Sequence, residues 1–69
     1  MSRPSAIGLI VRSRNALLAD ADERSFTEAE RLRAAAADLT RLLFDVRAGR
    51  VNAFELNEPE RMRVVISAA

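Results

Sequence analysis

The segment from Phe26 to Gly49 carries the signals of one long amphipathic helix. Its apolar residues recur at alternating steps of three and four, which places them on one helix face. This stripe, with two residues that widen it, consists of Ala29, Leu32, Ala35, Ala36, Leu39, Leu42, Leu43 and Val46. Thr27 and Glu30 have the spacing of a capping box, and Gly49 stands where a left-handed residue ends many helices. We therefore predict a helix over residues 28–48, whose apolar face needs partners to be stable in water.

A second helix is predicted over residues 5–21. Its apolar face, interrupted only by Arg14, consists of Ile7, Ile10, Val11, Leu17, Leu18 and Ala21. Ser2 or Ser5 can cap its start, and Pro4 is tolerated only in the first turn. An extended start over residues 6–11 competes with the helix, because Gly8 weakens a helix by about 1 kcal/mol relative to Ala. The short link to the next helix predicts an antiparallel pair.

The C-terminal third of the chain supports two interpretations. Asn57 and Glu60 repeat a cap pattern around Pro59, and the apolar residues that follow have helical spacing, which favours a short third helix or tail over residues 58–67. The β-branched run at residues 64–66 favours a terminal strand instead.

Residues 50–57 are expected to form a loop whose Phe54 and Leu56 fold back on the core. The expected fold is thus all-α, with one domain of residues 1–69: an antiparallel helical hairpin carrying a third short helix or tail.

The composition excludes most chemistry. A chain of 69 residues hides only about 60% of its unfolded surface, so chains of this size often depend on disulfides, metals or association. This chain has no Cys and no His, which excludes disulfides and the usual zinc sites, and we expect no metal. Lys and Tyr are also absent, so the usual general bases and nucleophiles are missing. We expect no enzymatic activity, no cofactor, and a homo-oligomer, with a dimer favoured.

A second, thinner apolar strip runs along the predicted central helix. Phe44 lies about 140° from Leu39 around that helix, by the period of 3.6 residues. The predicted partner or oligomer surface consists of Phe44, Ala37, Ala48, Leu43 and Phe54. The alternative is that the third helix and Phe54 cover Phe44 within the same chain.

Charge is segregated along the chain, although the net charge is only +1. The acidic turn between the helices contains Asp20, Asp22, Glu23 and Glu28, and it is either a solvated turn or a mimic for a basic partner site. Five arginines are candidate phosphate contacts: Arg3, Arg12, Arg14, Arg47 and Arg50. Aromatic residues do not interleave with them, so a base-stacking platform is not expected.

These observations favour a small helical regulator or inhibitor that acts through protein–protein contact, of a kind that bacteria, phages or mobile elements encode. One alternative is a DNA- or RNA-associated regulator that uses the arginines, and another is a small virion or scaffold component. The apolar run at residues 7–11 is far shorter than a membrane span, so we expect no membrane contact and a cytoplasmic location.

Overall fold

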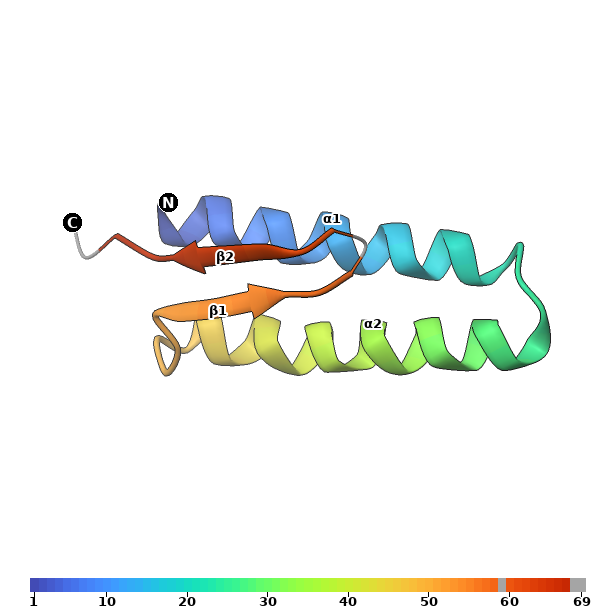
Figure 1. Ribbon diagram of the computed structural model, residues 1–69. Helices are drawn as coiled ribbons and strands as arrows, with labels where there is room; N and C mark the ends of the chain where they lie inside the picture. The colour runs from blue at the N-terminus through green and yellow to red at the C-terminus, as the bar shows by residue number, and fades with distance from the viewer. Residues whose placement is uncertain (59, 68–69) are drawn as a thin grey trace.

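The computed structural model describes residues 1–58 and 60–67. Its four elements are α1 (Arg3–Ala21), α2 (Phe26–Arg47), β1 (Ala53–Leu56) and β2 (Met62–Val65). The helices form an antiparallel hairpin, and the strands form a second hairpin that lies over the half of the helices near the N-terminus (Figure 1). The molecule is therefore an elongated rod of 43 × 18 × 14 Å, with the sheet covering one end.

The predicted helical hairpin is confirmed, with small changes at its boundaries. Ser2 is the N-cap of α1, where its hydroxyl accepts a hydrogen bond from the Ser5 amide at 3.2 Å, and Pro4 lies in the first turn. The competing extended start is wrong, because residues 6–11 are helical.

The capping box predicted for the second helix is wrong. The N-cap of α2 is Ser25, and Thr27 already lies inside the helix. The turn after α1 is tight, since the Arg24 amide donates to the Ala21 carbonyl at 3.2 Å. The chain therefore enters α2 earlier, and the Ala29 amide bonds the Ser25 carbonyl at 2.8 Å.

The end of α2 follows the prediction. Gly49 has a φ of 77°, the left-handed region that glycine enters without a steric penalty. The Gly49 amide donates to the Val46 carbonyl at 3.1 Å and the Arg50 amide donates to the Asp45 carbonyl at 2.9 Å. These two bonds make a Schellman motif, which turns the chain back toward the sheet.

The all-α expectation is wrong in the C-terminal third. Residues 62–65 form a strand that pairs antiparallel with residues 53–56, so the described part of residues 58–67 contains a strand where a helix was favoured, and residues 53–56 are a strand rather than a loop. The β-branched residues there restrict helical rotamers, and an extended partner with apolar residues at every second position was available to pair with them. Pro59, expected in a first helical turn, lies outside the described residues.

The two strands bury one face of their sheet. Phe54 pairs with Val64 and Leu56 pairs with Met62, which places all four side chains on the face toward the helices. Leu56 is 2% exposed, and Phe54 packs against the core, so the prediction that both fold inward is confirmed.

The core divides into two clusters along the rod. The cluster under the sheet consists of Ala6, Ile10, Leu43, Val46, Val64 and Ile66. The cluster beyond the sheet lies between the helices alone and consists of Leu17, Ala21, Ala29, Leu32 and Ala36. The predicted stripe of α2 thus faces the core: five of its residues are buried, and Ala35, Leu39 and Leu42 are half-buried, with Leu39 packed against both clusters.

The buried face of α1 differs from the one predicted. It is centred on Ala6, Ile10, Ser13, Leu17 and Ala21. Leu18, expected on that face, is 40% exposed. Ala6, Ser13 and Ala21 are small, so this face of α1 can pack closely against its neighbours.

Candidate functional site

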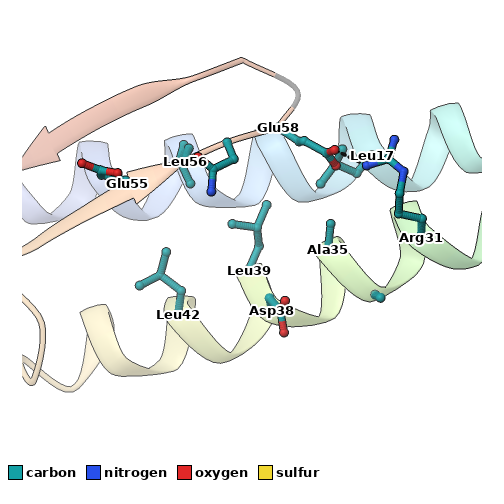
Figure 2. A pocket seen from close by; sticks show the side chains of 11 residues that line it. Leu17, Arg31, Ala35, Asp38, Leu39, Leu42, Glu55, Leu56 and Glu58 are labelled. Carbon is teal, nitrogen blue, oxygen red and sulfur yellow. Dashed lines mark hydrogen bonds and ion pairs between the residues drawn. The ribbon is translucent and has the colours of Figure 1, made fainter.

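An open groove of about 410 Å³ lies between α2 and β1 (Figure 2). Its lining comes from one face of α2, from β1 and the residues after it, and from a single leucine of α1. The lining residues are Leu17, Arg31, Ala34, Ala35, Asp38, Leu39, Leu42, Glu55, Leu56, Asn57 and Glu58. The groove is therefore apolar in its interior and charged at its borders.

The helix side of the groove is the flank of the buried stripe of α2. Figure 2 shows Ala35, Leu39 and Leu42 pointing from α2 toward β1. Leu39 and Leu42 are half-buried. Each packs on one side against the cluster under the sheet and lines the groove on the other. Ala34 and Ala35 leave room because they are small.

The strand side of the groove is the outer edge of β1. The Ile66 amide donates to the Asn52 carbonyl at 2.8 Å, which makes residues 52 and 66 a hydrogen-bonded pair in the antiparallel ladder. Pairs alternate in such a ladder, so Phe54 and Leu56 direct their backbone groups toward β2. Ala53 and Glu55 direct their amides and carbonyls away from β2, and Glu55 lines the groove. Hydrogen bonds to these outward groups are not found within the described residues.

The outer edge of β2 is different, because Met1 lies against it. The Met1 ammonium donates to the Val65 carbonyl at 3.1 Å, and the Ser67 amide donates to the Met1 carbonyl at 2.7 Å. Residues 65 and 67 are those whose backbone groups point outward from β2 by the same alternation. The N-terminal residue thus closes part of one sheet edge, while the edge on the groove stays open.

An ion pair closes one end of the groove. Arg31 on α2 donates a hydrogen bond to Glu58, which follows β1, and a second to Glu28 at 3.3 Å. The hydrogen bond that Arg31 donates to Glu58, followed by the one that it donates to Glu28, raises the pKa of Arg31 above its usual value. Glu58 Oε2 is buried without a hydrogen-bond partner in the described structure, so Glu58 retains one acceptor at this border.

The structure separates the residues predicted to form a partner surface. Phe44 is 56% exposed, and Ala37 and Ala48 are also exposed. Leu43 is buried in the core, and Phe54 packs against that core from the sheet. Neither the sheet nor Phe54 covers Phe44, so the exposed part of the predicted surface is the strip of Phe44, Ala37 and Ala48.

The acidic turn is largely paired with arginines. Asp20 accepts a hydrogen bond from Arg24 at 3.0 Å, and Asp22 lies 3.8 Å from Arg33. The hydrogen bond to Asp20 raises the pKa of Arg24. Glu23 is exposed, and Glu28 shares Arg31 with Glu58. The turn therefore presents little uncompensated negative charge to a basic partner.

The five candidate phosphate contacts do not form one patch. Arg3 is engaged inside the molecule, where it donates to the Val46 carbonyl at 2.7 Å and to Asn52 Oδ1 at 2.8 Å. Arg50 pairs with Asp45 at 3.1 Å, which replaces the Arg41–Asp45 pair that helical spacing suggests. Arg14 donates to Asn15 at 3.3 Å. The remaining two, Arg12 and Arg47, are exposed on different helices.

The groove itself was not apparent from the sequence, because its strand side was assigned to a loop. The available signal was the large apolar residue at every second position, Phe54 and Leu56 in one segment and Met62 and Val64 in the other, which is the period of a half-buried strand. Groups of three or more potential metal ligands are not found among the described residues. The described helices also include none long and apolar enough to cross a membrane.

Comparison of the chain with protein-family models, with curated proteins and with solved structures finds no match. The groove, the open edge of β1 and the exposed apolar strip are therefore the features of this chain that bear on its function.

Proposed function

We propose that this chain is a small non-enzymatic binding protein that regulates or inhibits a protein partner by direct contact. The observation that supports this most strongly is the groove between α2 and β1. It combines half-buried leucines with open backbone groups, which is the mixture of apolar anchor and polar rim typical of protein-contact sites. The groove also lies on rigid elements, so a partner would not have to order it on binding.

Self-association is part of the same proposal. The strip of Phe44, Ala37 and Ala48 is exposed on α2, and a phenylalanine that is 56% exposed is a favourable anchor for a second copy. The strip and the groove involve different residues of α2, so a homodimer through Phe44 is compatible with a partner in the groove.

A groove-blocking variant tests the proposal by affinity capture from the native host. Ala34 is exposed and lines the groove, so Ala34→Trp fills the groove without disturbing the core. Ala19 is an exposed alanine of α1 outside the groove, and Ala19→Trp is the matched control. We expect proteins captured by the unmodified chain and by the control to be lost with Ala34→Trp. Equal capture by all three chains would show that the groove is not the contact site.

The nucleic-acid alternative has weaker support, because Arg3 and Arg50 are engaged within the molecule. Affinity for nucleic acid that falls steeply with salt would revive it, since phosphate contacts release counterions. Higher-order particles in place of a discrete dimer would instead favour a virion or scaffold component.

A further inference from the structure

We propose that the groove accepts an extended segment of a partner protein, which adds to β1 as a third, antiparallel strand with an alternating apolar–basic–apolar pattern. This inference rests on the proposed function, because it specifies how a protein partner occupies the groove.

The two-stranded sheet is too narrow to cover both helices. Packed helices lie about 8–10 Å apart, whereas neighbouring strands lie about 4.8 Å apart, so two strands cannot cover two helices fully. The uncovered strip falls on the α2 side, where Ala35, Leu39 and Leu42 face the groove. One more strand beside β1 would lie over these side chains and complete the layer.

The outer edge of β1 carries backbone groups that can bind a further strand. Glu55 presents its amide and carbonyl to the groove and Ala53 presents its own on the same outer edge of β1, whereas Met1 already occupies outward groups of β2. An antiparallel strand that binds to β1 would place its own hydrogen-bonded residues opposite Ala53 and Glu55. These backbone bonds would supply affinity that is independent of the partner's side chains.

The two faces of the sheet would select different side chains in an added strand. Phe54 and Leu56 face the helices, so the added residues beside them lie over leucines and should be apolar. Glu55 lies on the outer face opposite Arg63 of β2. An added residue on the other side of Glu55 would complete a row of alternating charge if it were Lys or Arg, and it would be repelled if it were acidic.

The test uses a capped synthetic peptide, Thr-Val-Lys-Val-Lys-Val-Thr, titrated into the intact chain and followed by NMR. We expect the amide signals of Ala53 and Glu55 to shift and their hydrogen exchange to slow. The same peptide with Glu in place of Lys should bind about threefold more weakly, because the pair with Glu55 changes from attraction to repulsion, each worth a few tenths of a kcal/mol. Glu55→Lys should make the chain prefer the Glu peptide. Glu60→Lys makes an equal charge change on the β1–β2 connection, and this variant should still prefer the Lys peptide.

Backbone methylation separates strand addition from simple apolar or charge contact. N-methylation of both Lys residues removes the amides that face β1 in an antiparallel strand, so binding should be lost. N-methylation of the central Val is the control, because its amide points away from β1, and binding should remain. If only the peptide methylated at Val lost binding, a strand would add to β1 in the parallel direction, and the proposed antiparallel orientation would be overturned.

Two outcomes would overturn the inference. Equal binding of the unmethylated peptide and both methylated peptides would exclude backbone pairing, and so would unchanged exchange at Ala53 and Glu55 on saturation. If Ala34→Trp nevertheless abolished partner capture, the groove would remain the contact site and only the mode of contact would be wrong. If Ala34→Trp left capture intact, the proposed function itself would fail.

Discussion

At the scale of single residues, Arg3 shows how a charge that looks available for a ligand is used inside the fold. Its guanidinium donates to the Val46 carbonyl at 2.7 Å and the Val51 carbonyl at 3.3 Å, as well as to the Asn52 side chain. Carbonyls at the C-terminal end of a helix lack intrahelical partners and carry partial negative charge, so a cation there is favourable. Arg3 thus joins the start of α1 to the end of α2 and the approach to β1.

Arg3→Lys is expected to destabilise the chain even though the charge is kept. An ammonium group cannot reach several acceptors with the planar geometry of a guanidinium, so at least one contact should be lost. We expect a loss of about 1–3 kcal/mol in the free energy of unfolding, measured by chemical denaturation. Arg12→Lys, on the exposed side of α1, is the matched control and should change stability little. Equal effects of the two variants would contradict a structural role for Arg3.

The two glycines predict opposite effects of substitution by alanine. Gly49 has a φ of 77°, and a Cβ there would meet no atom within 4 Å, so Gly49→Ala is strained only by its backbone. We expect it to destabilise the chain by about 1 kcal/mol. Gly8 lies inside α1, where a Cβ would approach only the flexible end of Arg12 at 3.2 Å.

Gly8→Ala should therefore stabilise the chain by up to about 1 kcal/mol, because alanine favours the helix. Thermal unfolding of both variants checks the pair, and shifts of the same sign would show that one of these two backbone assignments is wrong.

At the scale of elements, the helices could be predicted and the sheet could not. The stripe of α2 and the terminator at Gly49 are local signals, because residues three and four apart meet on a helix regardless of the remaining chain. The strands depend on pairing between segments that are individually short. Residues 62–65 alone fit either period, and only the partner at residues 53–56 decides between them. The groove depends on that pairing and was missed for the same reason.

The β1–β2 register predicts which amides are protected from hydrogen exchange. The Phe54 and Leu56 amides point toward β2, so they should exchange slowly, whereas those of Ala53 and Glu55 should exchange at rates near those of exposed backbone. Native-state exchange measured by NMR checks this alternation. A ladder shifted by one residue would reverse the pattern, and the outer edge would then carry the backbone groups of Phe54 and Leu56 in place of those of Ala53 and Glu55.

At the scale of the whole molecule, the rod leaves more surface uncovered than a compact chain of this size. Its accessible surface is 4659 Å², against about 4,300 Å² for a typical monomer of this mass. Its radius of gyration is 12.5 Å, against about 11 Å expected for this length. The excess follows from the narrow sheet, which covers only one end of the helical hairpin, and it is consistent with an expectation of association.

Phe44→Ala should weaken self-association while leaving the fold intact. Phe44 is 56% exposed, so its removal costs the single chain little, whereas it would anchor a contact with a second copy. Sedimentation at micromolar concentration should show a dimer for the unmodified chain and a lighter species for Phe44→Ala. Phe26 is 78% exposed at the other end of α2, and Phe26→Ala is the matched control. A monomer for the unmodified chain would remove the homodimer from the proposal.

The position of α2 below the open edge of β1 also protects the protein from uncontrolled aggregation. Bare strand edges are templates on which identical molecules can stack into fibres. Here, a second molecule approaching edge to edge would bring its own helical layer with it. In an antiparallel edge-to-edge pair both helical layers lie on the same face, so the α2 side chains that line the groove beside β1 would meet those of the second copy as the strands approached about 4.8 Å. The edge is therefore more accessible to a lone strand without attached helices than to a second copy that approaches antiparallel.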